Sequence, residues 1–236
     1  MSTHELCEVI DDFCERLLYD ANGPEKCREY LQEDELPTEA RRAGGKLARD
    51  ILSGKQNVIG KHNVKQPGER YVKETLIWPL LDALGHTTRI ESFLGESDKQ
   101  ADFRIVSTPE LVVGECKSPN KYEKAIIDVR ENIDEAVFDT RHAIVTDGLN
   151  WSLLTYSNRS LGGEPEYVAV ADIRPAIASR FKMHRIRSPH RPAREGFRKS
   201  SVSQSYQYET DTTRVLEDFS EKFSRTAVNE SSIFEN

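Results

Sequence analysis

The chain contains the stretch Ala101-Asp102-Phe103-Arg104-Ile105-Val106 and, after Ser107-Thr108-Pro109-Glu110, the stretch Leu111-Val112-Val113-Gly114-Glu115-Cys116-Lys117. Both stretches are rich in apolar residues, and the short polar segment between them is typical of a tight reversal, so the pattern predicts a β-hairpin. Side chains alternate between the two faces of a strand, so we expect Glu115 and Lys117 on one face and Cys116 on the other. The hairpin would also bring Asp102 and Glu115 into one site.

The residue types at this hairpin are those of a metal site. Two carboxylates supply the hard oxygen ligands that Mg²⁺ prefers, and Mg²⁺ keeps several waters, so it needs few protein ligands. We expect Mn²⁺ to substitute for it. A neighbouring lysine, Lys117, would orient or deprotonate the attacking water. The alternative is an exposed strand edge, where Asp102 and Glu115 form cross-strand pairs with Lys117 or Arg104.

In this order and spacing, Asp102, Glu115 and Lys117 resemble the motif of the PD-(D/E)XK nuclease superfamily, with Ala101 in place of the usual proline. The resemblance covers roughly residues 69–156 and is closest to the N-terminal nuclease domain of type I restriction enzyme R subunits. It implies a Mg²⁺-dependent endonuclease that hydrolyses DNA phosphodiester bonds in restriction, defence or DNA processing. It also implies that the backbone carbonyl of Cys116 is a metal ligand.

Three further segments match that family's pattern: an acidic residue on an upstream helix (Glu74), a helix after the lysine, and a strand, turn and strand over residues 143–156. The chain departs from the pattern on the helix after the lysine. The related restriction subunits carry a Gln and a Tyr there, whereas this chain has Arg130, Glu131, Asn132 and Glu135. The resemblance therefore assigns no residue to the fine positioning of DNA.

Glu74 lies on a predicted helix over residues 69–84, which ends at Gly85 and whose apolar stripe comprises Ile77, Leu80, Leu81 and Leu84. Because Glu74 precedes Ile77 by three positions, its side chain should border the buried stripe, where a carboxylate needs a partner. One interpretation makes Glu74 a catalytic residue that binds the metal or a water on it. The other is a salt bridge to Lys73, Arg70 or a more distant arginine.

Residues 121–138 have the apolar spacing of a helix. A connection of this length joins parallel strands by a right-handed crossover, so residues 143–146 should lie beside the strand of Glu115. The expected fold is therefore α/β, a restriction-endonuclease-like mixed sheet flanked by helices, with an N-terminal helical extension. Lys121 and Lys124 begin the crossover helix and are candidates for contact with a nucleic-acid phosphate, with simple solvent exposure as the alternative.

The chain divides into three expected regions, which are an N-terminal helical extension (residues 1–60), a nuclease core (61–178) and a basic linker with a polar tail (179–236). Helices over residues 6–19 and 25–53 should cover one face of the sheet or form a small cap on it. The tail contains one candidate helix over residues 213–225, whose apolar face should dock on the core. We expect the last ten residues to be loose.

Charge is unevenly distributed along the chain. The net charge of −7 and the pI near 5.5 disfavour a DNA-binding protein. Residues 180–199, however, contain eight basic residues against one acidic residue. This segment is either a solvated linker or a nucleic-acid contact, with Arg185 and Arg187 as the candidate DNA-binding residues. Because the remainder is acidic, any DNA binding should be strongly salt-sensitive.

Several other functions are disfavoured. Gly54 and the Gly60-Lys61 pair do not form a phosphate-binding loop, because five residues separate the glycines and His62 stands where a Ser or Thr is required. An ATP-driven translocase, or a modification subunit, would therefore be a separate partner chain. The four cysteines match no zinc pattern, and no apolar stretch is long enough to span a membrane. We expect a cytoplasmic protein with reduced thiols and no membrane partner.

Two other functions remain open on the sequence. The chain could be a noncatalytic DNA-binding or assembly subunit that retains a nuclease fold. It could also be an RNA-directed nuclease on the same fold, because the metal acts on phosphate and not on sugar. For the DNA endonuclease, cutting both strands at a symmetric site would favour a homodimer.

Overall fold

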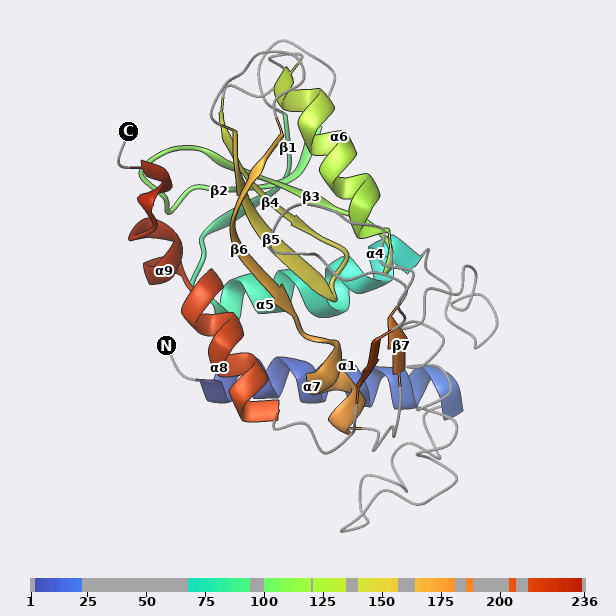
Figure 1. Ribbon diagram of the computed structural model, residues 1–236. Coiled ribbons are helices and arrows are strands. Elements are labelled where there is room, and N and C mark those ends of the chain that lie inside the picture. Colours follow the sequence, from blue (N-terminus) through green and yellow to red (C-terminus); the bar gives the residue numbers. More distant parts are fainter. Residues whose placement is uncertain are drawn as a thin grey trace.

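A six-stranded mixed sheet forms the centre of the protein (Figure 1). The computed structural model describes residues 3–22, 68–93, 100–119, 121–134, 140–156, 164–180, 186–188, 204–206 and 212–234. The strands lie side by side in chain order: β1 (Thr88–Phe93), β2 (Gln100–Ile105), β3 (Val112–Cys116), β4 (His142–Thr146), β5 (Asn150–Thr155) and β6 (Glu166–Asp172). Neighbouring strands are antiparallel except β3 and β4, which are parallel. The predicted α/β class with a mixed sheet is confirmed.

The β2–β3 hairpin and the crossover that follows it have the predicted topology. In the hairpin, Phe103 of β2 lies opposite Gly114 of β3. The helix α6 (Tyr122–Asp134) then crosses the sheet and returns the chain to β4, where Val145 lies opposite Glu115. A helix is the usual connection here, because parallel strands cannot be joined by a tight turn. The strand of Glu115 is thus an interior strand, held by neighbours on both sides.

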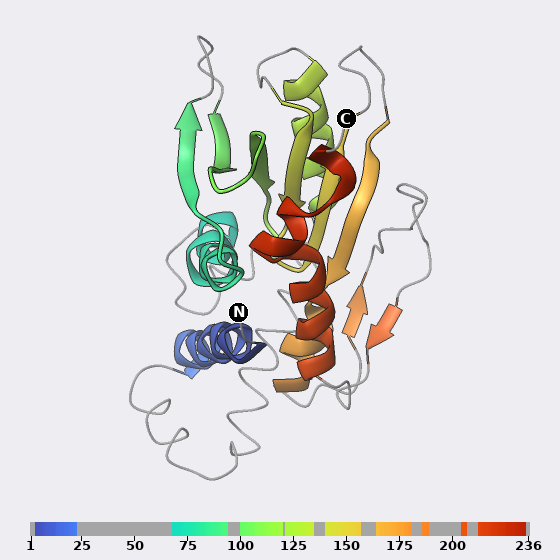
Figure 2. The ribbon, with the colours of Figure 1, turned by 90° about the vertical axis from the view of Figure 1, so that its left-hand side faces the viewer.

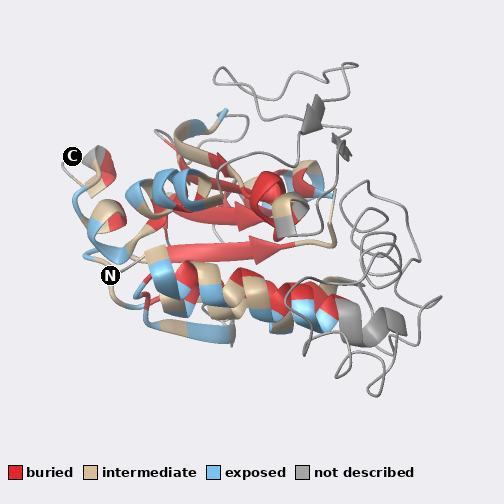
Figure 3. Ribbon diagram, turned by 90° about the horizontal axis from the view of Figure 1, so that it is seen from below, coloured by how far each residue is buried: buried red, intermediate tan, exposed pale blue. Residues whose placement is uncertain are grey.

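Helices cover both faces of the sheet. On one face, α6 packs against β3 and β4 and closes a cluster that includes Val113, Ala143 and Val145. On the other face, the helical segment 68–83, α1 (Thr3–Asn22) and α8 (Thr212–Phe223) form a second, larger cluster with the sheet. Figure 2 shows α6 and α8 on opposite sides of the strands. Seen from below in Figure 3, the strands are buried between the helical layers.

The helix predicted over residues 69–84 is present but not regular. It consists of α4 (Gly68–Val72), a π turn η2 (Lys73–Ile77) and α5 (Trp78–Ala83). Pro79 accounts for the π turn, because proline lacks an N–H and its ring clashes with the carbonyl four residues earlier. The helix widens just before Pro79, and the Trp78 N–H donates to the Lys73 carbonyl, five residues back. Such π turns shift the side chains that follow out of regular helical register.

The helices at the two ends of the chain share one core with the sheet. The rings of Phe219 and Phe223 on α8 lie with their centroids 5.2 and 6.1 Å from that of Trp151 on β5. Leu6 and Ile10 of α1 belong to the same buried cluster. The predicted docking of the tail helix is therefore confirmed. The described helices α1 and α8 thus pack into the same buried cluster as the sheet.

The expectation of a loose C-terminus is wrong for the residues up to 234. The chain continues as α9 (Arg225–Asn229) and the short helix η3 (Ser232–Phe234). Val228 and Ile233 are buried, and the ring of Phe234 lies 5.2 Å from that of His142. The Asn229 side chain donates to the backbone carbonyl of Ser107, 3.1 Å away. Apolar residues too few to form a periodic pattern therefore anchor this segment by packing, together with long-range hydrogen bonds such as that from Asn229.

A short helix and a small two-stranded sheet complete the described chain. The helix α7 (Arg174–Arg180) follows β6, and β7 (Ile186–Ser188) pairs with β8 (Gln204–Tyr206) in a separate two-stranded sheet. The helix predicted over residues 25–53 and most of the basic segment lie outside the described residues. Among the helices that the structure describes, none combines the length and the apolar character that crossing a bilayer requires.

Candidate active site

Asp102 lies where β2 and β3 separate. Pairing between the two strands ends at Phe103 and Gly114, and beyond that point the Cys116 N–H donates to Oδ2 of Asp102, 2.7 Å away, instead of to a β2 carbonyl. The other oxygen, Oδ1, accepts from Nζ of Lys73 at 2.5 Å. The Asp102 carboxylate therefore joins the end of β3 to the helix on the opposite side of the gap, with its side chain one-fifth exposed.

Glu115 and Lys117 point to the same side of β3, as the alternation predicts. Their side chains form an ion pair, and Nζ of Lys117 also lies 2.9 Å from Oδ2 of Asp128 on α6. Cys116 points the other way and is fully buried in the larger core cluster. Burial, followed by the charge of Asp102, raises the pKa of the Cys116 thiol well above its ordinary value. The thiol is therefore a packing group, and only its backbone faces the site.

The local environment changes the acidity of three groups in the site. Burial, reinforced by the negative charge of Asp102, raises the pKa of Glu115 to about 7, although the Lys117 ammonium opposes this shift. Burial alone would lower the pKa of Lys117, but its contacts with Glu115 and Asp128 outweigh burial and raise that pKa. The pKa of Lys73 is raised in the same way, against burial, by Asp102 and Glu69. Both lysines are therefore held as cations.

We use the term site cluster for two adjoining groups of charged side chains. Glu69, Lys73 and Asp102 form one group, and Glu115, Lys117 and Asp128 form the other. The two groups are close enough for the charge of Asp102 to act on Glu115. Four carboxylates against two ammonium groups leave a formal charge of −2. Partly buried like charges are costly unless a counter-ion is present. A divalent cation would neutralise this excess, so the donor set fits Mg²⁺ or Mn²⁺.

The protein ligands alone would not complete a metal site. In the described part of the chain, no three His, Cys, Asp or Glu side chains stand close enough together to hold a metal. Asp102 and Glu115 offer one carboxylate each, and the Cys116 carbonyl adds a neutral oxygen on the same strand. The remaining positions would belong to water, which suits Mg²⁺ because this ion dehydrates reluctantly.

The prediction that Glu74 borders the buried face is wrong. Its side chain is exposed, and Oε1 accepts from Nε of Arg70 at 2.7 Å, which is one of the salt bridges that the sequence left open. The physical reason is the π turn that contains Glu74, because the prediction assumed regular α-helical spacing up to Ile77. The helix instead directs Lys73 toward Asp102, with Glu69 one turn earlier as its second partner.

Three members of the site cluster were missed by sequence reasoning: Glu69, Lys73 and Asp128. Glu69 and Lys73 are four residues apart, the spacing of a helical ion pair, and Pro79 in a helical pattern indicates a distortion nearby. Asp128 lies on the face of α6 that reaches Lys117. The sequence alone does not show this, because the face of α6 that meets Lys117 is known only once the packing of α6 against the sheet is known.

The candidate nucleic-acid-binding residues are placed only in part. Lys121 and Lys124 are exposed at the start of α6, next to the end of β3, where a phosphate could reach them. The backbone of Arg187 lies on β7 opposite Ser205. Arg185 falls outside the described residues.

A buried polar network stabilises the turn beside the site. Both oxygens of Asp147 accept from the Asn150 side chain, and its Oδ1 also accepts from the Leu149 and Asn150 N–H groups. The Asn150 carbonyl oxygen Oδ1 accepts from the fully buried Arg174 at 2.8 Å. The neighbouring Thr146 carbonyl accepts from the Lys117 N–H at 3.0 Å. The network thus fixes the turn after Thr146, whose carbonyl binds the backbone of Lys117.

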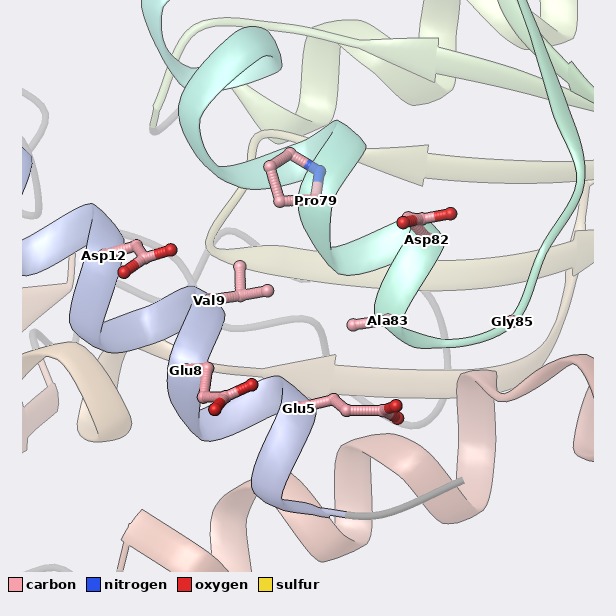
Figure 4. Close-up of a pocket in the computed structure, with 8 residues that line it drawn as sticks. All are labelled: Glu5, Glu8, Val9, Asp12, Pro79, Asp82, Ala83 and Gly85. Atoms are coloured by element: carbon pink, nitrogen blue, oxygen red, sulfur yellow. The ribbon is translucent and has the colours of Figure 1, made fainter.

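An acidic pocket lies away from this site, between α1 and α5 (Figure 4). It has a volume of about 520 Å³ and is lined in part by Glu5, Glu8, Asp12 and Asp82. Four carboxylates on one surface repel a phosphate backbone. We therefore expect nucleic acid to approach the protein from another side.

No family model, curated protein or solved structure matches this chain. A function for this chain therefore has to be inferred from the geometry of the site cluster. Chemically, the site cluster offers two convergent carboxylates, a backbone carbonyl and a fixed ammonium group within one partly buried site. This set can hold a hard cation and stabilise the negative charge of a bound anion.

A Mg²⁺ ion bound by Glu115 would stabilise the protein more at pH 8 than at pH 6. The pKa of Glu115 is about 7 in the folded protein, against an ordinary value of 4.5. The folded protein therefore holds this proton more tightly than the unfolded chain, and the protonated Glu115 contributes stability that is lost as pH rises from 4.5 to 7. At pH 6 a metal bound by Glu115 would have to displace its proton, whereas at pH 8 the carboxylate is already ionised. Thermal unfolding with and without Mg²⁺ at both pH values measures the difference.

The matched variants for this experiment are Glu115→Gln and Glu74→Gln. Without metal, wild type should lose about 1 kcal/mol relative to Glu115→Gln between pH 6 and pH 8. Glu74→Gln, which removes an exposed carboxylate that pairs with Arg70, should behave like wild type. An equal gain from Mg²⁺ at both pH values would show that Glu115 does not bind the metal.

Proposed function

We propose that this protein is a Mg²⁺-dependent endonuclease that hydrolyses DNA phosphodiester bonds on a restriction-endonuclease-like PD-(D/E)XK fold. The observation that carries the proposal is that Asp102, which accepts the Cys116 N–H where β2 and β3 separate, lies close enough to Glu115 to raise its pKa, with Lys117 paired to Glu115. The parallel β3–β4 pair and the helical crossover support the same fold. The formal charge of −2 in the site cluster supports a divalent cation.

In the proposed mechanism, Asp102, Glu115 and the Cys116 carbonyl would hold the metal. When bound, Mg²⁺ or Mn²⁺ supplies polarisation of the scissile phosphate and of the attacking water. Lys117 is held as an ammonium by Glu115 and Asp128, so it orients the water and stabilises the phosphate charge instead of acting as a base. Of the two roles expected from the sequence, the pKa of Lys117 favours the orienting one.

We infer that the substrate reaches the site over the start of α6, where Lys121 and Lys124 are exposed. Contacts to phosphate there would position the backbone without selecting a sequence. The chain's overall acidity would make this binding salt-sensitive. A separate ATP-driven translocase or modification subunit, and pairing of two copies for double-strand cutting, are the partners that this function would call for.

One observation favours a second candidate, a noncatalytic DNA-binding or assembly subunit. Both central carboxylates are engaged by lysines, Asp102 by Lys73 and Glu115 by Lys117, and the described residues offer no three-carboxylate cage. Internal ion pairs of this kind can replace a metal permanently in a domain that has lost catalysis. The two candidates differ in whether the protein cuts.

Cleavage assays decide between them. Wild type, Asp102→Asn and Glu74→Gln are incubated with linear, supercoiled and single-stranded DNA and with RNA, in Mg²⁺, Mn²⁺ or EDTA. We expect metal-dependent DNA cleavage by wild type and Glu74→Gln, and its loss in Asp102→Asn. Cleavage of RNA alone would assign an RNA-directed nuclease. DNA binding without cleavage in any metal would favour the noncatalytic subunit.

A further inference from the structure

Lys73 is the group in the site whose position the proposed chemistry does not explain. It lies at the start of the π turn η2, and its side chain is largely buried, with 17% exposed. Its ammonium group contacts Oδ1 of Asp102 at 2.5 Å and Oε1 of Glu69 at 2.9 Å. Burying a lysine is costly, and here two carboxylates compensate for the loss of water.

The contact with Asp102 blocks the oxygen that a metal would use. Oδ2 of Asp102 is held by the backbone N–H of Cys116, whereas Oδ1 is held by the side chain of Lys73, so Oδ1 is the oxygen that a side-chain movement can release to a cation. An ammonium group and a divalent ion both lie within about 3 Å of the oxygen that they bind, and at that spacing their charges repel strongly. Metal binding at Oδ1 therefore requires Lys73 to move.

Glu69 gives Lys73 somewhere to move. It lies one helical turn before Lys73 on the same helix, and the two are already within contact distance. Rotation of the lysine side chain toward Glu69 would free Oδ1 of Asp102 and keep the ammonium paired, with no movement of the helix backbone. The same pair of contacts thus offers a closed and an open arrangement of the site.

We propose that Lys73 is a built-in competitor for the metal: it neutralises Asp102 while the site is empty and moves onto Glu69 when a divalent cation binds. This inference rests on the proposed metal site. It makes Lys73 a positioning residue that sets the metal concentration at which the site fills. The protein would then remain inactive at low Mg²⁺ and would not leave Asp102 unpaired.

Mn²⁺ binding tests this proposal without reference to cleavage. The electron paramagnetic resonance signal of free Mn²⁺ is titrated with wild type, Lys73→Gln and Lys73→Met. Both variants remove the competing charge. Lys73→Gln also keeps an N–H donor for Asp102, so the two variants place different demands on folding. We expect Mn²⁺ affinity to rise by about tenfold or more. Lys222→Met, which removes a charge on α8, should leave it unchanged.

Glu69→Gln tests the movement itself. It should weaken Mn²⁺ binding in wild type, because Lys73 loses its second partner, and should have little effect when combined with Lys73→Met. An equal loss in both backgrounds would make Glu69 a direct metal ligand and overturn the movement onto it. Unchanged or weaker Mn²⁺ binding in the folded Lys73 variants would overturn the competition.

The failure of this inference and the failure of the proposed function give different results. If wild type binds Mn²⁺ and cuts DNA but the Lys73 variants bind Mn²⁺ no more tightly, only the competition is wrong. If neither wild type nor the Lys73 variants bind Mn²⁺, the metal site is wrong and both proposals fall. If the Lys73 variants bind Mn²⁺ tightly but no form cuts nucleic acid, the competition stands and the nuclease activity does not.

Discussion

Replacing Lys117 by Met should slow metal-dependent cleavage by about a hundredfold or more while leaving Mn²⁺ binding within a few-fold of wild type. Unlike the contact of Lys73 with Asp102, the contact of Lys117 is with Oε1 of Glu115, and a metal would use the other oxygen, Oε2. The Lys117 side chain is largely buried, with 14% exposed, and its ammonium is fixed between Glu115 and Asp128. Methionine retains most of the apolar stem but removes the charge that would stabilise the phosphate. Loss of one such preorganised group lowers an enzymatic rate by about a hundredfold to a thousandfold. Single-turnover cleavage and Mn²⁺ titration measure the two effects separately.

The separation of these effects distinguishes Lys117 from the metal ligands. Asp102→Asn should lose both Mn²⁺ binding and cleavage, whereas Lys117→Met should lose cleavage alone. Lys222→Met, with its ion pair to Asp218 on α8, controls for the loss of one positive charge. Cleavage by Lys117→Met at the wild-type rate would remove this residue from the mechanism. A joint loss of Mn²⁺ binding would make it a structural partner of Glu115 instead.

Short-range patterns were sufficient to predict the central hairpin. The alternation around Cys116 determines which side chains face the site, and the length of the segment after Lys117 requires a crossover. Both predictions depend on strand geometry, which varies little from one protein to another. The convergence of Asp102 and Glu115 followed from pairing the two strands.

The helix before β1 was harder to predict, because one backbone irregularity changes what each side chain meets. Regular helical spacing predicted that Glu74 borders the buried face. The π turn before Pro79 instead leaves Glu74 exposed and paired with Arg70, and it directs Lys73 to Asp102. Sequence shows that proline disturbs a helix but not whether the chain kinks, ends or widens. The partner of Asp102 could therefore not be assigned.

The C-terminal segment was mispredicted for a different reason. Val228, Ile233 and Phe234 are too widely spaced to form a periodic apolar pattern, and they pack only because the sheet and α5 are already in place. The Arg225 N–H, for example, donates to the carbonyl of Leu84 at the end of α5. Contacts between segments so far apart in the chain have no local sequence signal.

The contact of Phe103 with Gly114 is another feature that only the pairing of strands reveals. Phe103 follows Asp102 and Gly114 precedes Glu115, and the two residues lie opposite each other. The buried Phe103 ring covers the space where a side chain at position 114 would stand, and it packs edge-on against Trp78, with centroids 5.6 Å apart. An aromatic ring over a cross-strand glycine fixes the register of the hairpin. The two carboxylates are aligned by this contact.

Gly114→Ala should therefore destabilise the protein by about 3 kcal/mol, at the upper end of the range for overpacked cores. A Cβ at this position would overlap the Phe103 ring, which is fully buried and held by Trp78, so the ring cannot move aside cheaply. Urea unfolding measures the loss of stability. Cleavage and Mn²⁺ affinity should fall together, because displacement of the ring separates Asp102 from Glu115.

The double variant Gly114→Ala/Phe103→Leu is the control for this mechanism. Leucine is smaller than phenylalanine and leaves room for the new methyl group, so the double variant should be more stable than the sum of the two single changes predicts. Coupling of about 1 kcal/mol or more would attribute the loss to the ring at this contact. Additive effects would instead mean that the methyl group is accommodated by movement of β3. In that case the alignment of Asp102 and Glu115 would depend on Lys73 and the Cys116 N–H, and not on the fit of Phe103 over Gly114.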